Sequence, residues 1–133
     1  MNVVFDSNIF ISATLTPGGK AEQAIQHIIE GRDHLLLSKD MIVEILDVLA
    51  QKFSRDQEEL ARVAVYLSEL GELVKPVRRL KVLNDNPDNR ILECAVEGHA
   101  GRIVTGDQVM LELGQYKGIQ IVSLREYLEN RES

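Results

Sequence analysis

The chain has 133 residues, 44% of them hydrophobic, and its 15 basic and 21 acidic side chains give a formal net charge of −6 at pH 7. This length and apolar content predict one compact domain over residues 1–133 and exclude a second independent core. The acidity excludes nucleic-acid binding through the net field of the protein, so such a partner would need a local basic patch or bound cations.

The cysteine count and the first residues bear on the compartment. Cys94 is the single cysteine, so it cannot form an internal disulfide, and its helical neighbours predict a buried structural thiol. The opening Met-Asn-Val-Val-Phe-Asp lacks the basic and apolar regions of a secretory signal, and no apolar run approaches transmembrane length. We therefore expect a reducing, cytoplasmic location and no membrane partner.

In chain order, short β-branched and aliphatic runs alternate with longer amphipathic segments. Four runs are typical of buried strands: residues 3–5, 35–37, 103–105 and 119–122. A further short strand and a loop are expected between Leu73 and Asn86, where Pro76 and several charges weaken the pattern. The alternation predicts an α/β fold, a three-layer α/β/α sandwich with a mainly parallel central sheet.

The amphipathic segments predict helices with recognisable ends. Residues 20–30 place five apolar side chains on one stripe, and Gly31 follows as a stop. The other helices are expected after Ser38, over residues 57–70 before Gly71, from Pro87 to about residue 97, over residues 108–113, and after Ser123.

Four acidic residues stand where apolar runs end or turn. Asp6 and Asp107 each follow a predicted strand, so both would lie at the sheet edge where open α/β folds bind ligands. Glu44 lies at the rim of the apolar face of its helix, and Asp88 lies in the first turn of another. Because a doubly wound sheet brings strand ends and helix starts onto one rim, we expect the four acids to converge.

Each acid also has an ordinary structural explanation. Asp6 can be a turn residue or a helix cap, and Asp107 can be a helix cap. The helix dipole favours Asp88 in a first turn, and Glu44 can simply face water. Taken jointly, clustered carboxylates that stay ionised need a counter-charge, and oxygen-only ligation favours Mg²⁺ or Mn²⁺ over zinc. The three histidines are dispersed and Cys94 has no second thiol, so a zinc site is not expected.

Four stretches that contain these acids resemble the ordered motifs of PIN-domain nucleases. They read Val-Val-Phe-Asp-Ser-Asn-Ile-Phe-Ile-Ser-Ala, Ser-Lys-Asp-Met-Ile-Val-Glu-Ile, Asp-Asn-Pro-Asp-Asn-Arg-Ile-Leu-Glu-Cys-Ala and Ile-Val-Thr-Gly-Asp. They most resemble the branch of toxins from toxin–antitoxin pairs, akin to VapC-type proteins, over nearly the whole chain. One departure is that Asp-Pro-Asp-Asp of that branch reads Asp85-Asn-Pro-Asp88 here, which leaves Asp88 the better ligand match and Asp85 an accessory candidate.

The resemblance implies a metal-dependent endoribonuclease with one or two Mg²⁺ or Mn²⁺ ions, acting as the toxin of a toxin–antitoxin pair. The implied catalytic residues and metal ligands are Asp6, Glu44, Asp88 and Asp107. The implied accessory residues are Asn8, Asp85 and Thr105. RNA, an antitoxin protein and a second copy of the chain, in a homodimer or higher homo-oligomer, are the implied partners.

Basic side chains near these motifs are candidates for RNA contacts. Phosphate contacts are predicted from Arg90, two residues beyond Asp88, and from Lys20 in the Thr-Pro-Gly-Gly-Lys loop. The densest basic run, residues 75–81, could extend that surface, although such runs commonly just face water. With 5% aromatic residues and no Trp, base stacking cannot be the main source of affinity.

Two other functional classes stay open at this point. A non-catalytic PIN-like module would grip RNA or a protein without cutting, but it has no need for four acids on one rim. A phosphoacceptor receiver-type domain also uses acids at strand ends. That class has a pair of acids after the first strand and a Lys after the last strand. Here the first strand is followed by the single acid of Asp6-Ser7-Asn8, and the last strand is followed by Ser123.

Overall fold

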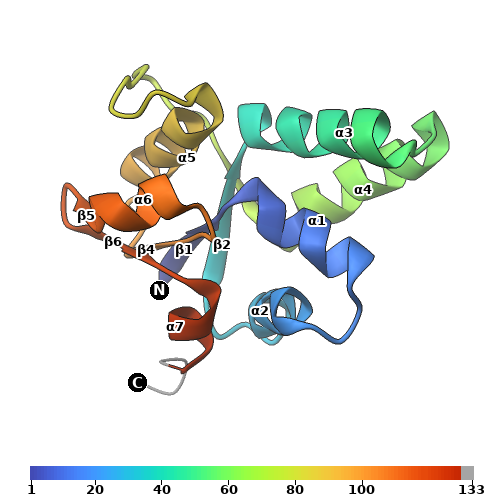
Figure 1. Cartoon of the computed structure of the whole chain (residues 1–133), viewed down its shortest axis with the longest axis horizontal. Coiled ribbons are helices and arrows are strands. Elements are labelled where there is room, and N and C mark those ends of the chain that lie inside the picture. The colour runs from blue at the N-terminus through green and yellow to red at the C-terminus, as the bar shows by residue number, and fades with distance from the viewer. Residues whose placement is uncertain (130–133) are drawn as a thin grey trace.

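The computed structural model, which describes residues 1–129, contains one six-stranded sheet with helices on both faces (Figure 1). The strands are β1 (Asn2–Phe5), β2 (His34–Ser38), β3 (Glu72–Val74), β4 (Arg102–Val104), β5 (Gln115–Tyr116) and β6 (Ile119–Val122). Their order is β3-β2-β1-β4-β6-β5, with every neighbouring pair parallel except β5 and β6. The predicted mainly parallel sheet is thus confirmed, while the last four residues of the predicted domain, 130–133, lie outside the described part.

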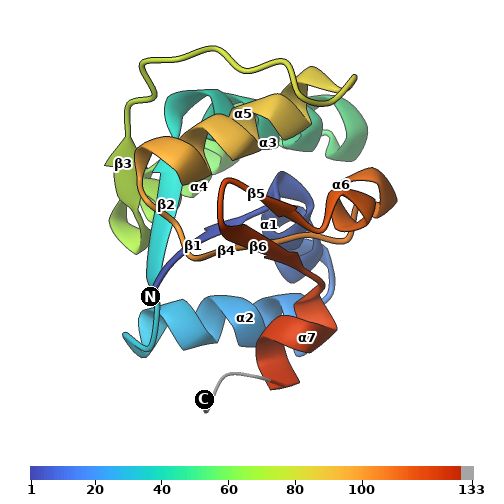
Figure 2. The same ribbon diagram turned by 90° about the vertical axis from the view of Figure 1, so that its left-hand side faces the viewer.

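The helices form the two outer layers. They are α1 (Ser7–Leu15), α2 (Lys20–Ile29), α3 (Lys39–Phe53), α4 (Gln57–Leu70), α5 (Asn86–Glu97), α6 (Gln108–Leu113) and α7 (Leu124–Glu129). Figure 2 shows α3, α4 and α5 on one side of the sheet and α2 and α7 on the other. None of the helices within residues 1–129 is both long enough and apolar enough to cross a membrane.

Two elements were not predicted. In α1 the three consecutive side chains of Ile9, Phe10 and Ile11 are all buried, so its apolar residues do not follow the helical spacing of an amphipathic surface helix. The strand β5 has two residues, and it exists because Tyr116 and Gln115 pair with β6 across a tight turn. Such pairing depends on the rest of the sheet and leaves little trace in the local sequence.

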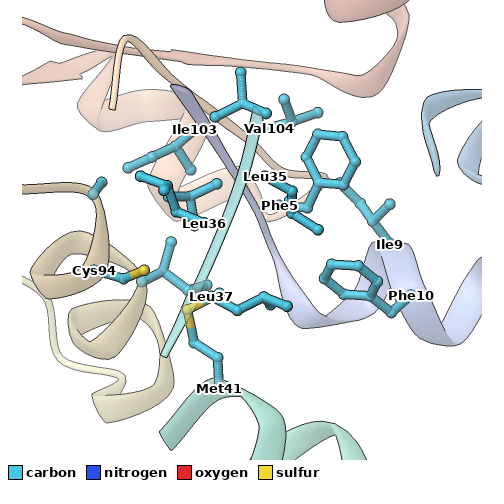
Figure 3. Close-up of a cluster of buried hydrophobic side chains, with 14 of the residues drawn as sticks. Phe5, Ile9, Phe10, Leu35, Leu36, Leu37, Met41, Cys94, Ile103 and Val104 are labelled. Atoms are coloured by element: carbon cyan, nitrogen blue, oxygen red, sulfur yellow. The ribbon is translucent and has the colours of Figure 1, made fainter. Parts of the chain in front are cut away.

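The core is built around β1, the central strand. Val3, Val4 and Phe5 are fully buried, as expected for a parallel strand covered by helices on both faces. Figure 3 shows Phe5, Ile9 and Phe10 gathered in one part of the cluster, and the Phe5 and Phe10 ring centroids are 6.0 Å apart. Cys94 is also fully buried, and burial raises the pKa of its thiol to about 12, which confirms the predicted structural role.

The sheet order determines where a ligand can bind. From β1 the chain adds β2 and β3 on one side, whereas β4 and β6 lie on the other side. The carboxyl ends of β1 and β4 therefore flank the point where the winding direction reverses, which is where open parallel sheets leave a crevice. Asp6 follows β1 and Asp107 lies three residues after β4, so both acids stand at this point.

Candidate active site

A cavity of about 80 Å³ lies at the reversal point of the sheet. At roughly 30 Å³ for each water molecule in the liquid, it has space for two or three water molecules or small ions. All four predicted acids line it, together with the accessory candidates Asp85 and Asn8. Its remaining lining residues are Ser7, Ile11, Val48, Pro87 and Ile91. Side chains from four separate stretches of sequence therefore meet here, as the topology argument predicted.

Asp6 is held by two hydrogen bonds that fix both of its oxygens. It caps α1, with Oδ1 accepting from the backbone N–H of Asn8 at 3.1 Å. Its Oδ2 accepts from the Thr105 hydroxyl at 2.6 Å, and Thr105 is fully buried. The same hydroxyl oxygen accepts from the backbone N–H of Asp107 at 3.0 Å. Thr105 thus ties the acid after β1 to the acid after β4.

Glu44 is oriented by a residue that the sequence did not single out. The hydroxyl of Ser7 donates to Glu44 Oε2 at 3.0 Å, which links the first turn of α1 to α3. Ser7 is buried, whereas Glu44 is half-buried. The available signal was a small hydroxyl residue directly after Asp6, but it does not distinguish a ligand-orienting serine from an ordinary first-turn residue.

Asp107 and Asp88 complete the ring, and both also have the structural roles considered above. Asp107 caps α6, with Oδ2 accepting from the backbone N–H of Met110 at 3.0 Å. Asp88 lies in the first turn of α5 and is only 7% exposed. Asp107 therefore acts as a helix cap, and Asp88 interacts favourably with the dipole of α5. Both positions also bring the carboxylate to the cavity, so these structural roles are compatible with binding a ligand there.

The cavity concentrates negative charge. Burial raises the pKa of Asp88 to about 7, and the nearby charges of Asp107, Asp85 and Asp6 and a hydrogen bond to Asp107 act in the same direction. Burial also raises the pKa of Glu44, against the lowering effect of its bond from Ser7. Within residues 1–129, no Lys, Arg or His lines the cavity. The carboxylates thus lack a counter-charge from side chains around them.

These residues fit a hard divalent cation in donor type and in charge. Every charged side chain lining the cavity is a carboxylate, which suits Mg²⁺ or Mn²⁺, and the surplus negative charge is what such an ion offsets. In the part of the chain that the structure describes, no three His, Cys, Asp or Glu side chains are already close enough together to hold an ion. Binding would therefore require the carboxylates to move toward one another.

Comparison with known proteins decides the family. The sequence model of the PIN domain matches residues 2–109, which includes all four acids. The chain belongs to the PIN domain family. Uncharacterized protein MJ1680 of Methanocaldococcus jannaschii is 26% identical to this PIN domain over 117 residues, which is 85% of this chain and 75% of that protein.

Solved structures share the fold of this PIN domain. VapBC-1 from nontypeable Haemophilus influenzae matches with a TM-score of 0.65 at 17% identity, over 94% of this chain and 99% of that one. VapBC2 from Rickettsia felis, bound to a DNA fragment from its promoter, matches with a TM-score of 0.63 at 11% identity, over 92% and 98% of the two chains. At these identities the likeness is one of fold.

The two cations predicted to contact RNA phosphates lie elsewhere in the PIN domain. Arg90 is 21% exposed, and its Nη2 atom contacts Glu93 Oε2 at 3.0 Å and the Leu80 carbonyl at 3.2 Å. Lys20 begins α2 and borders a separate surface hollow beside α7. Neither side chain lines the acidic cavity, so the structure does not bring them together with the acids.

Proposed function

We propose that this PIN domain is a divalent-metal-dependent endoribonuclease and the toxin component of a toxin–antitoxin pair. The observation that carries the proposal is the ring of five carboxylates, from Asp6, Glu44, Asp85, Asp88 and Asp107, around a cavity at the reversal point of the sheet. A protein that only bound RNA would gain nothing from gathering negative charge without a counter-charge there, because RNA is itself a polyanion.

The roles follow from how firmly each carboxylate is held. Asp6 is fixed through both oxygens, so it sets the position of the site, while Glu44, Asp88 and Asp107 complete the set that would hold Mg²⁺ or Mn²⁺. A divalent cation held there supplies Lewis-acid chemistry, which lowers the pKa of water and offsets charge on the phosphodiester. Thr105 and Ser7 act as positioning residues, since each holds a carboxylate in place by a hydrogen bond.

Asp88 makes binding of the cation dependent on pH. With a pKa of about 7, this carboxyl carries a proton for much of the time at neutral pH in the metal-free protein. A cation competes with that proton, so the affinity for Mn²⁺ should rise between pH 6 and pH 8. Titration calorimetry at the two pH values measures this directly, with the variant Asp88→Asn as the comparison.

The decisive test is cleavage of a labelled single-stranded RNA after treatment of the protein with EDTA. We expect cleavage only when Mg²⁺ or Mn²⁺ is restored, and none above background for Asp6→Asn. Glu69→Gln, on the exposed side of α4, is the matched control and should cleave like the wild type. Cleavage that needs no metal, or wild-type cleavage by folded Asp6→Asn, would contradict the proposal. RNA binding without any metal-dependent cleavage would favour the non-catalytic module instead.

We also propose an antitoxin protein and a second copy of the chain as partners. The support is that both structures reported above are VapBC structures, and this chain shares their fold over more than nine-tenths of its length. Co-expression with the protein encoded beside it, followed by size-exclusion chromatography with light scattering, tests both. A monomer that never co-purifies with such a protein would overturn this part.

A further inference from the structure

The segment before α5, residues 75–83, is fastened along that helix, and we call it the basic strap. Its last residues are held by Asn89, which is fully buried. The backbone N–H groups of Val82 and Leu83 donate to Asn89 Oδ1 at 3.0 Å and 2.9 Å, and Asn89 Nδ2 donates to the Leu83 carbonyl at 2.8 Å. The Asn89 side chain therefore fixes Val82 and Leu83, the last two residues of the strap, at the end nearer the cavity.

Two glutamates continue this fastening along the same face of α5. The backbone N–H of Leu80 donates to Glu93 Oε2 at 2.7 Å, and that of Val77 donates to Glu97 Oε1 at 3.2 Å. Asn89, Glu93 and Glu97 are four residues apart, so they share one face of the helix. The strap is therefore an ordered surface, and a ligand can bind it with little further ordering of the backbone.

The strap carries positive charge that is only partly paired with acidic side chains in residues 1–129. It contains four basic residues and no acidic one, in a chain of net charge −6. Arg79 is paired, at 3.0 Å from Asp40 and 3.4 Å from Glu93. Lys75, Arg78 and Lys81 are exposed, and none of them has an ion-pair partner within residues 1–129.

The strap leads to the acidic cavity. Its fastenings run from Glu97 back to Asn89, a span of eight helical residues or about 12 Å, toward the first turn of α5. Pro87 and Asp88 in that turn line the cavity, and so does Asp85, two residues beyond the end of the strap. Figure 2 shows this segment passing along the outer side of α5, from β3 to the start of the helix.

We propose that the basic strap binds the backbone phosphates of the single-stranded RNA substrate on one side of the cleavage point, through Lys75, Arg78 and Lys81. This rests on the proposed function. Cations held by the cavity can offset the charge of the phosphate being cleaved, but the neighbouring phosphates of the strand meet an acidic protein. The strap supplies positive charge along α5 on an ordered backbone that leads to the cavity, where those phosphates would pass.

The test compares two triple variants with the same change of charge. Lys75→Gln/Arg78→Gln/Lys81→Gln removes the free cations of the strap. Arg32→Gln/Lys52→Gln/Arg125→Gln removes three exposed cations from the α2–β2 loop, α3 and α7. Binding of a fluorescein-labelled 12-nucleotide RNA is followed by anisotropy in EDTA, over a range of salt concentrations. Thermal melting checks that both variants are folded.

We expect the strap variant to bind at least tenfold more weakly at low salt, and the control to stay within about twofold of the wild type. Loss of three phosphate contacts should reduce the slope of log K against log salt by about 2, because each contact to a single strand contributes about 0.7. In cleavage assays with Mn²⁺ the strap variant should raise KM and leave kcat within about twofold. If the triple variant does not fold, Arg78→Gln alone should reduce the slope by about 0.7.

The outcomes separate this proposal from the nuclease proposal. If both triple variants bind RNA equally weakly, or if the strap variant binds RNA as well as the wild type, the proposal that the strap binds RNA is wrong. Metal-dependent cleavage can still be correct in that case. Strap-dependent RNA binding without metal-dependent cleavage supports the strap and removes the nuclease. Absence of RNA binding by the wild type, or a strap defect seen only with an acidic protein ligand, overturns the assignment of the strap to RNA.

Discussion

Removing the charge of Asp88 should stabilise the metal-free protein above neutral pH. The folded-state pKa of about 7 lies above the ordinary value of 3.8, so the proton on this carboxyl favours the folded state. That contribution is complete below pH 3.8 and is lost as the pH rises through 7. Between pH 5 and pH 8 the stabilisation is lost mainly over the two pH units below the pKa. At about 1.36 kcal/mol for each unit, the loss in the free energy of unfolding is about 3 kcal/mol. Asp88→Asn cannot ionise and should escape this loss.

Urea denaturation in EDTA gives the free energy of unfolding of Asp88→Asn and of the wild type. The effect is measured as the change, from pH 5 to pH 8, in the difference between these two free energies. We expect this difference to move by about 3 kcal/mol in favour of Asp88→Asn. The exposed control Glu69→Gln should show a change under about 0.5 kcal/mol. Adding Mn²⁺ at pH 8 should stabilise the wild type more than Asp88→Asn. A difference that is the same at both pH values would refute the reasoning that burial and neighbouring carboxylates oppose ionisation of Asp88.

Three further substitutions test other parts of the structure. Thr105→Val removes the 2.6 Å bond to Asp6 and should reduce kcat/KM with Mn²⁺ by about ten- to a hundredfold in a folded protein, and an unchanged rate would contradict its positioning role. Asn89→Ala strips three partners from the strap backbone and should cost about 2–4 kcal/mol in urea denaturation. The exposed Asn84→Ala is its control, and equal stability of the two variants would contradict the fastening. Gly98→Ala places a Cβ against the side chain of Leu36 in β2, and thermal denaturation should report a loss of about 1–3 kcal/mol rather than none.

Most of the fold follows from patterns that are local in the sequence. The helix over residues 57–70 was predicted with both ends correct, because an amphipathic stripe runs up to Gly71. The N-cap at Ser123 was also predicted, and its hydroxyl accepts from the backbone N–H of Glu126 at 3.1 Å. The helix α1 was not predicted because its consecutive buried apolar residues, Ile9, Phe10 and Ile11, have the composition of a buried strand. The strand β5 was not predicted because two residues pair only when β6 is already in place.

Some features of the candidate site could be predicted from the sequence, and others could not. Convergence of Asp6 and Asp107 could be predicted, since parallel strand ends share one edge whatever the loop details. The hydrogen bond from Ser7 to Glu44 could not, because it joins residues 37 positions apart through the packing of α1 on α3. The pairing of Arg90 with Glu93 had a visible signal, as opposite charges three residues apart on a helix commonly meet.

The two edge strands of the sheet are unusually short, with three residues in β3 and two in β5. Each leaves few free backbone N–H and C=O groups, so edge-to-edge strand addition, the common route to aggregation of β proteins, has little template here. Self-association would instead have to use helical surfaces such as the outer side of α4, where Val65 is 56% and Tyr66 47% exposed. The molecule is thereby protected from polymerising through its sheet while keeping apolar contacts available for a defined partner.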